Sequence, residues 1–180
     1  MSDVLTPAEL TLLGLLVERP RHGYQLEEVI TERGIREWTE IGFSSIYYLI
    51  GKLRDRGFVA ELDGSARRQA KARKVFAATA AGRAACAAAA ADAVAALVPM
   101  FPPVLVGLAN QPVIPPARLH AALAARADAL TERIAAVRAA AETQRGAPPF
   151  VGALFDYSLA LLGAEQAWLA DYRTALSAKD

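Results

Sequence analysis

The hydrophobic pattern of the N-terminal part of the chain changes its period once, at Gly57. Before this glycine, apolar residues recur every three or four positions, which is the spacing of one face of an α-helix. After it come two short strand-like runs, residues 58–62 and 74–78, separated by residues that favour turns. The pattern therefore predicts three helices followed by a β-hairpin.

The first helix carries its own start and stop signals. Thr6 suits the N-cap, Pro7 the first turn, and Glu9 the position that closes a capping box. The helix is expected to end at Arg19, because a residue that precedes a proline disfavours the helical conformation. Its apolar stripe is Leu10, Leu13, Leu16 and Val17.

Two more helices are expected before Gly57. The second runs from about Gly23 to Arg33 and stops at Gly34, since glycine commonly terminates helices. Its inward face is Tyr24, Leu26, Val29 and Ile30. The third is capped by Ser44 or Ser45 and ends at Gly57. Its buried face is Ile46, Leu49, Ile50 and Leu53.

Positive charge gathers in the loop of the expected hairpin. Between Gly64 and Arg83 there are six basic residues and no acidic ones, whereas from Ala84 onward there are seven basic and eight acidic residues. Such a cluster alone is more often a solvated loop than a binding site. Here it follows three helices, which is the winged helix-turn-helix order, with the third helix in the major groove and the hairpin beside it.

The exposed face of the third helix favours contact with DNA. Short hydroxyl groups and a tyrosine suit close approach to base edges and phosphates, and we expect Ser44, Ser45 and Tyr48 to make such contacts. Tyr47 is expected either to contact DNA or to pack at the flank of the helix. Basic side chains supply affinity that depends on salt but not on sequence. The candidates for this role are Lys52, Arg67, Arg68, Lys71, Arg73 and Lys74.

In these segments the chain resembles the PadR family of bacterial transcriptional regulators. The resemblance is carried, in order, by residues 12–17 with 22–26, 45–53, 56–59, and 73–76 leading into 79–83. It implies a homodimer that binds near-palindromic operator DNA, commonly as a repressor, and releases it on binding a small ligand. The chain departs from the family pattern at Val75, where an aromatic residue is usual, and at Gly42-Phe43, where a proline often precedes the third helix.

The second half is expected to be helical. A helix capped by Thr79 should continue through the alanine-rich residues 82–98 and break at Pro99. The apolar stretch from Met100 to Pro116 should pack and hold one short helix at residues 104–109. Two long helices then follow, separated by residues 146–149.

The two long helices predict dimerisation, because one chain of this length offers too little surface to bury both of their apolar seams. The residues expected to dimerise are Leu119, Leu123, Leu130, Ile134, Val137, Leu154, Leu161 and Trp168. Glu165 lies within an apolar face and needs a partner such as Arg126 or Arg133.

Several aromatic residues of this half, together with one of the first, could line a pocket for an apolar or aromatic effector. The candidates are Trp38, Phe155, Trp168 and Tyr172. Aromatic residues at helical spacing are more often core than pocket, so a packing role is the main alternative.

The remaining signals argue against other classes of protein. Cys86 stands alone, and neither His22 nor His120 has neighbours spaced as metal ligands or catalytic partners, so no cofactor, metal site or enzymatic activity is expected. An enzyme would have to depend on carboxylates such as Asp156 and Glu165. No apolar run is long enough to span a membrane, and a cytoplasmic location is expected.

The sequence thus predicts a mainly α protein with a winged helix-turn-helix domain at residues 1–83 and a helical dimerisation domain at residues 84–180. The winged domain would consist of three helices and a two-stranded hairpin. The alternative is a winged-helix protein-interaction module that does not bind DNA.

Overall fold

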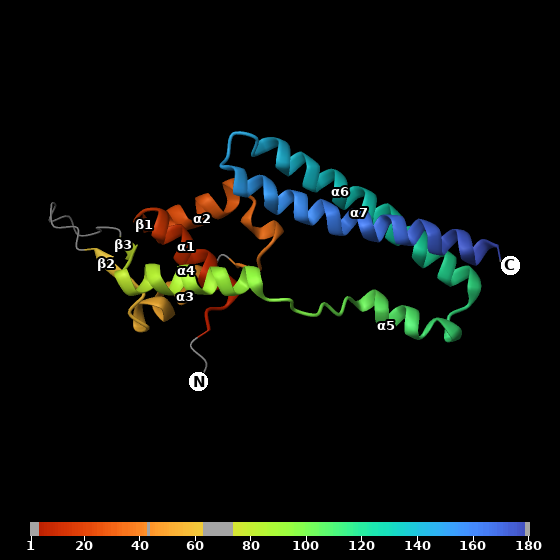
Figure 1. The fold of residues 1–180 in the computed structure, drawn as a ribbon, viewed down its shortest axis with the longest axis horizontal. Helices are drawn as coiled ribbons and strands as arrows, with labels where there is room; N and C mark the ends of the chain where they lie inside the picture. The colour runs from red at the N-terminus through yellow and green to blue at the C-terminus, as the bar shows by residue number, and fades with distance from the viewer. Residues whose placement is uncertain (1–3, 43, 63–73, 179–180) are drawn as a thin grey trace. The chain divides into compact units, whose positions relative to one another are not determined.

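The computed structural model describes residues 4–42, 44–62 and 74–178, which divide into two compact units, one up to Val98 and one from Pro99 (Figure 1). The elements of the first unit are α1 (Pro7–Glu18), β1 (Arg21–His22), α2 (Gly23–Glu32), the 3₁₀ turn η1 (Ile35–Glu37), α3 (Ser45–Asp55), β2 (Val59–Leu62), β3 (Val75–Ala78) and α4 (Ala80–Ala95). Those of the second unit are α5 (Pro103–Ala109), the 3₁₀ turn η2 (Gln111–Val113), α6 (Pro116–Thr143) and α7 (Pro149–Ser177).

The start and end of α1 are as the sequence predicts. The Thr6 hydroxyl accepts a hydrogen bond from the Glu9 backbone at 3.2 Å, and the Glu9 carboxylate accepts one from the Thr6 backbone at 2.8 Å. The expected apolar stripe is only partly correct, because Val17 is exposed and Leu10 half-buried. The helix lies in the centre of the unit and buries a wider face, formed by Leu12, Leu13, Leu15 and Leu16.

α3 packs on α1 and α2 packs on α3, with the residues expected apart from one. Tyr24 was predicted to face inward but is 56% exposed, because it lies in the first turn of α2, on the side away from Leu26 and Ile30. Gly34 and Gly57 both follow helices and have positive φ, 60° and 73°, which is the conformation that glycine adopts without strain. The buried residues of α3 are Ile46, Leu49, Ile50 and Leu53.

The hairpin belongs to a sheet of three strands, not two. β2 and β3 pair antiparallel, with Val59 opposite Ala78, and β1 adds itself to the other edge of β3, with Arg21 opposite Phe76. The sequence pattern does not indicate β1, because two residues are too few to show a strand period.

α4 belongs to the first unit, so the division of the chain falls later than the boundary expected after residue 83. Thr79 caps the helix through a 2.9 Å bond from the Gly82 backbone, and Cys86 and Ala89 pack against the core of the unit. Gly82 lies so close to the preceding segment that a Cβ would meet the Phe58 carbonyl oxygen. The helix ends at Ala95, ahead of the expected residue 98, and Ala96 after it is extended, with φ −74° and ψ 124°.

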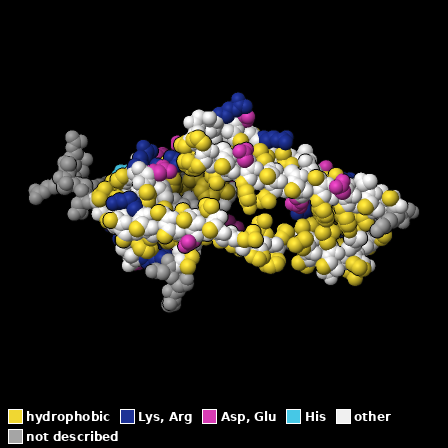
Figure 2. Space-filling model, viewed as in Figure 1, with side chains coloured by type: hydrophobic (Ala, Val, Ile, Leu, Met, Phe, Trp, Pro, Cys, Tyr) yellow, Lys and Arg dark blue, Asp and Glu magenta, His cyan; other side chains and the backbone are white. Residues whose placement is uncertain are grey.

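The segment between α4 and α6 does not pack as expected. α5 forms close to its predicted bounds, but most of the large apolar residues around it lie at the surface (Figure 2). Phe101 is 83% exposed and Val113 is 81% exposed. Met100, Leu105 and Val106 are exposed as well.

α6 and α7 form an antiparallel pair that buries one seam of each helix (Figure 1). Leu169 of α7 is 1% exposed and packs against the seam of α6. The residues expected to dimerise through α6 are therefore buried within the chain, and Leu119, Leu123 and Leu130 form a cluster with Leu169 of α7. Ile134 and Val137 complete the buried seam of α6. Glu165 meets Arg126, one of its two expected partners, at 2.7 Å.

The architecture confirms the mainly helical winged-helix fold followed by a helical region. None of the helices in the described part of the chain is both long and apolar enough to cross a membrane.

Candidate nucleic-acid interface

The exposed face of α3 presents two tyrosines and two serines. Tyr47 is 61% exposed and Tyr48 is 67% exposed, and Ser44 is also exposed. Ser44 occupies the N-cap position, but its side chain makes no capping hydrogen bond, so the predicted serine cap is wrong. Ser45 is half-buried, and its hydroxyl donates to the Gly42 carbonyl oxygen at 2.6 Å, which closes the turn before the helix.

The ring of Tyr47 packs against the first turn of α2. A Cβ at Gly23 would lie 2.5 Å from the Tyr47 ring, so only glycine allows this approach. The two residues share an open pocket of about 360 Å³ with His22, Tyr24 and Lys74. Tyr47 therefore packs against α2 and stays accessible, and its contact with DNA remains a prediction.

The base of the hairpin is fastened to the start of α2. The Nδ1 atom of His22 lies 3.2 Å from the Lys74 carbonyl oxygen, and the His22 backbone donates to Gln25 at 2.9 Å. Lys74 itself is 64% exposed and forms an ion pair with Glu61 at 3.0 Å. The other basic residues predicted for the hairpin lie outside the described residues, namely Arg67, Arg68, Lys71 and Arg73.

Lys52, expected to contact phosphate, forms an ion pair with α1 while its side chain stays 42% exposed. Its Nζ atom lies 2.7 Å from a carboxylate oxygen of Glu9, which is buried. The hydrogen bond to Glu9 raises the pKa of Lys52. Lys52 therefore links α3 to α1 through an ion pair, and its contact with phosphate remains a prediction.

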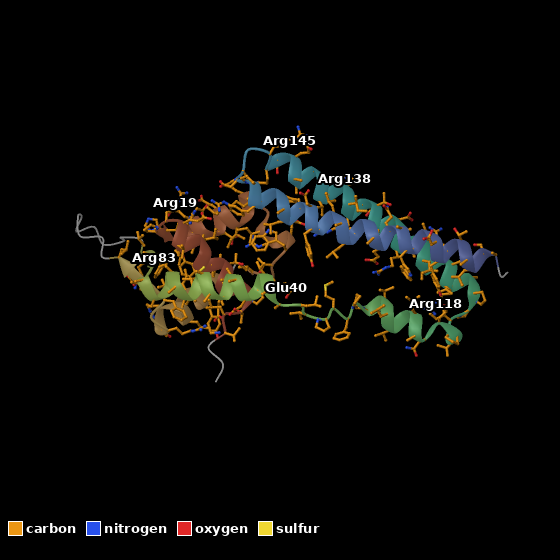
Figure 3. All side chains as sticks on the ribbon, viewed as in Figure 1. Arg19, Glu40, Arg83, Arg118, Arg138 and Arg145 are labelled. Carbon is orange, nitrogen blue, oxygen red and sulfur yellow. The ribbon has the colours of Figure 1, made fainter. Side chains whose placement is uncertain are left out.

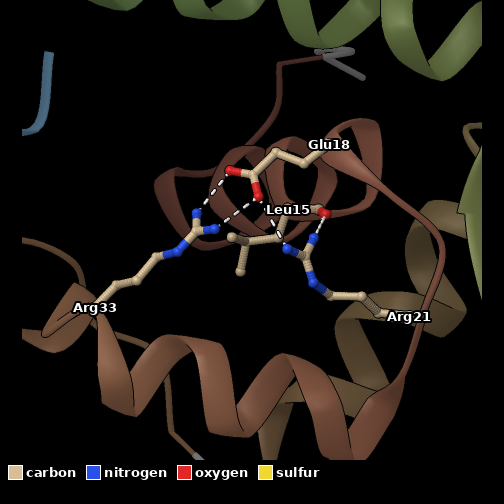
Figure 4. Close-up of polar contacts among 4 residues, drawn as sticks. All are labelled: Leu15, Glu18, Arg21 and Arg33. Atoms are coloured by element: carbon tan, nitrogen blue, oxygen red, sulfur yellow. Dashed lines mark hydrogen bonds and ion pairs between the residues drawn. The ribbon is translucent and has the colours of Figure 1, made fainter. Parts of the chain in front are cut away.

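The hairpin is held on its other side by a charged cluster that the sequence did not reveal (Figure 4). Arg21, the first residue of β1, is buried and donates to the Leu15 carbonyl oxygen and, at 2.9 Å, to Glu18. Glu18 also accepts two hydrogen bonds from Arg33, at 2.7 and 3.0 Å. Because β1 pairs with β3, this cluster fixes the strand on which the hairpin depends.

The electrostatics of Glu18 follow from these contacts. Burial alone would raise its pKa, but the hydrogen bonds from Arg33 and Arg21 outweigh burial, and the net result is a pKa below the ordinary value of 4.5. Glu18 is therefore charged at neutral pH and contributes stability through its charged form.

The first turn of α4 adds one more basic side chain beside β3. Arg83 donates to the Ala78 carbonyl oxygen at 2.9 Å and lies at the start of the helix (Figure 3). This contact ties the charged end of α4 to the end of the hairpin.

The residues predicted to bind an effector lie in both units. Trp38, in the first unit, is 45% exposed and lines an open pocket with Thr6 and Arg36. In the second unit Trp168 and Tyr172 stack, with ring centroids 5.4 Å apart and planes 12° apart, and the Tyr172 hydroxyl bonds Gln111. Phe155 is half-buried on the same helix.

Among the described residues there is no group of three or more histidine, cysteine, aspartate or glutamate side chains that could hold a metal ion. Burial raises the pKa of the Cys86 thiol, as expected for a small apolar packing residue.

Comparison with known proteins supports the resemblance seen in the sequence. Residues 12–88 match the model of the transcriptional regulator PadR-like family, whose members are regulators and not enzymes. A comparison with curated proteins finds no match. The predicted resemblance to this family is thereby confirmed.

Solved structures share the fold. Bacillus subtilis PadR in complex with operator DNA is 14% identical, with a TM-score of 0.72 over 93% of this chain and 98% of that chain. The same protein in complex with p-coumaric acid is 14% identical, with a TM-score of 0.76 over 94% and 98%. A PadR-like transcriptional regulator from Bacillus cereus is 19% identical, with a TM-score of 0.70 over 96% and 99%.

The Glu18 cluster generates a prediction about stability. Replacing Glu18 with Gln should lower the free energy of unfolding at pH 7 by about 1–2 kcal/mol, a moderate value because Glu18 is 40% exposed. Since its folded pKa is depressed, the advantage of the wild type should be complete above pH 4.5 and disappear as the pH falls through the lower folded value. Urea unfolding at several pH values measures this difference.

The matched control is Glu28→Gln, which removes an exposed glutamate from α2. It should leave stability nearly unchanged across the same pH range. Equal losses of stability in the two variants would contradict a specific role for Glu18.

Proposed function

We propose that this chain, a PadR-like transcriptional regulator, is a cytoplasmic homodimeric repressor that binds operator DNA and is released from it by a small aromatic effector. The observation that carries the proposal is the exposed serine and tyrosine face of α3, which adjoins the base of the hairpin within the family-like domain. A recognition helix beside a wing is the arrangement that winged helix-turn-helix proteins use in the major groove.

The proposed contacts divide by chemistry. Ser44, Ser45 and Tyr48, with Tyr47 at the flank, supply hydroxyl groups for base edges and nearby phosphates. The wing supplies charge for the phosphate backbone through Arg67, Arg68, Lys71, Arg73 and Lys74. The structure of Bacillus subtilis PadR with operator DNA supports the choice of DNA as the partner.

Removing charge from the wing tests this proposal. Replacing Arg67, Arg68 and Lys71 together with Ala should weaken binding to a mixed-sequence duplex and reduce its salt dependence, by about one in the log–log slope for each phosphate that the wing no longer neutralises. Fluorescence anisotropy at several salt concentrations gives both quantities. The specific probe is the DNA upstream of the protein's own coding sequence.

The matched control removes the same charge elsewhere. Arg118, Arg138 and Arg145 are exposed arginines of the second unit (Figure 3), and their replacement with Ala should leave the slope unchanged. If the wing variant behaves like this control, the wing does not bind phosphate. If the wild type binds neither duplex, the alternative of a protein-interaction module gains support.

The proposed dimer surface is the face of α7 that α6 leaves uncovered. Large apolar residues follow this face at helical spacing and are exposed to between 39% and 66%. They are Phe150, Leu154, Tyr157, Leu161 and Trp168. Exposed apolar faces of this length usually mark an interface, and a symmetric dimer would present two wings to a near-palindromic site.

Charge on this face should separate the protomers. Replacing Leu154 and Leu161 with Glu is expected to yield a monomer in sedimentation velocity, because each carboxylate would be buried at the interface without a partner. Ala136→Glu, at an exposed position of α6, is the control and should leave the dimer intact. A double variant that sediments like the wild type would rule out this surface.

The effector is proposed to stack on Trp168, with Tyr172 beside it. Phe155, elsewhere on α7, and Trp38, in the first unit, are separate candidates. Trp168 is 39% exposed, so an aromatic ring can reach the indole face that Tyr172 does not cover. Bacillus subtilis PadR has been solved with p-coumaric acid, which supports an aromatic acid as the probe.

Single-tryptophan variants test the effector site. The chain has two tryptophans, so Trp38→Phe leaves only Trp168 as a fluorescent reporter, and Trp168→Phe leaves only Trp38. Titration with p-coumaric acid should quench the first variant saturably and leave the second unaffected. Quenching of the Trp38 signal alone would move the site to the first unit.

A further inference from the structure

Among the described residues of the first unit, the most completely buried carboxylate is that of Glu9, and it points toward α3. Glu9 is 1% exposed, and one of its oxygens accepts a hydrogen bond from the Thr6 backbone at 2.8 Å, which serves the capping box of α1. The other oxygen lies 2.7 Å from the Nζ atom of Lys52, in α3. Capping alone does not require a charge at this position, since Gln completes a capping box as well as Glu does.

The charge on Glu9 is maintained by its partners. Burial would raise its pKa, but the hydrogen bonds from Lys52 and Thr6 outweigh burial and hold the pKa below 4.5. Arg56 lies 3.7 Å from the same carboxylate, and its guanidinium lies 4.8 Å from the centroid of the Phe58 ring. Lys52 is thus the closer of the two cations to Glu9.

Lys52 in turn faces the tyrosine proposed to contact bases. Its Nζ atom lies 5.9 Å from the centroid of the Tyr48 ring, one helical turn away, which is within the range of a cation–π interaction. Tyr48 is 67% exposed, so few other contacts limit the orientations of its ring. The Lys52 ammonium group, which is fixed by the buried Glu9 carboxylate, does limit the orientations of the Tyr48 ring.

We propose that Glu9, Lys52 and Tyr48 form a positioning relay, in which a buried charge on α1 orients the exposed tyrosine of the recognition helix. Lys52 then serves the placement of Tyr48 and not the phosphate backbone. An oriented ring loses less conformational freedom on binding, so the relay favours the specific duplex over a mixed-sequence one. This inference rests on the proposed DNA-binding function.

Specificity and salt dependence separate the relay from a phosphate contact. The variants Glu9→Gln and Lys52→Met should each lower the affinity ratio between the upstream duplex and a mixed-sequence duplex by about two- to fivefold. Neither should change the salt slope on the mixed-sequence duplex. Lys52→Arg keeps a cation within reach of both partners and should retain most of the wild-type ratio.

A double-variant comparison tests whether Glu9 acts through the tyrosine ring. In a Tyr48→Leu background, Glu9→Gln should have no further effect on the affinity ratio, because no ring remains to be oriented. A merely structural role for Glu9 would lower the ratio equally in both backgrounds. A salt slope reduced by about one in Lys52→Met, with the ratio unchanged in Glu9→Gln, would overturn the relay in favour of a phosphate contact.

A measurement without DNA judges the relay independently. The aromatic NMR signals of Tyr48, assigned with Tyr48→Phe, should shift in both Glu9→Gln and Lys52→Met but not in Asp55→Asn, an exposed change on the same helix. Signals that stay in place in the first two variants would refute the relay. If the wild type bound neither duplex, the proposed function would fail while these spectra still decided the relay.

Discussion

A carboxylate removed from water must be met by cations or hydrogen-bond donors. α1 carries a buried carboxylate, Glu9, near its start and a 40% exposed one, Glu18, at its end. Glu9, in the first turn, meets Lys52 of α3, and Glu18, at the last position, meets Arg21 of β1 and Arg33. The apolar face between them is the most buried part of the first unit. α1 therefore fixes α3 at one end and β1, an edge strand of the sheet, at the other.

The position of the wing depends on α1, although the sequence of the hairpin itself does not indicate this. β3 is paired on both sides, with β2 across the hairpin and with β1, so it is the central strand of the sheet. Arg21, the first residue of β1, donates a hydrogen bond to Glu18. His22, the last residue of β1, lies beside the Lys74 carbonyl oxygen. The orientation of a hairpin proposed to contact phosphates thus depends on the buried Arg21 and its ion pair with Glu18.

In the second unit, the pairing of α6 with α7 determines which apolar surface is left for association with another chain. α6 and α7 bury one seam of each helix against each other, so that Leu123 and Ile134 are already covered within the chain. What remains is the opposite face of α7, including Leu154 and Leu161, and the apolar segment around Phe101. An association surface proposed from the sequence alone had combined the inner and outer faces.

Structural features that depend on residues within one helical turn could be predicted from the sequence. The capping box of Thr6 and Glu9, the glycine at position 57 and the cap at Thr79 each depend on neighbours a few residues away, and all appear in the structure. The order of three helices and a hairpin followed from them, and so did the family resemblance. Contacts between residues far apart in the sequence could not be predicted, because the hydrophobic period and the composition do not identify distant partners. Only the tertiary structure showed that Glu9 pairs with Lys52, that β1 joins the sheet and that the seam of α6 faces α7. Each of these depends on which surfaces meet when the chain packs.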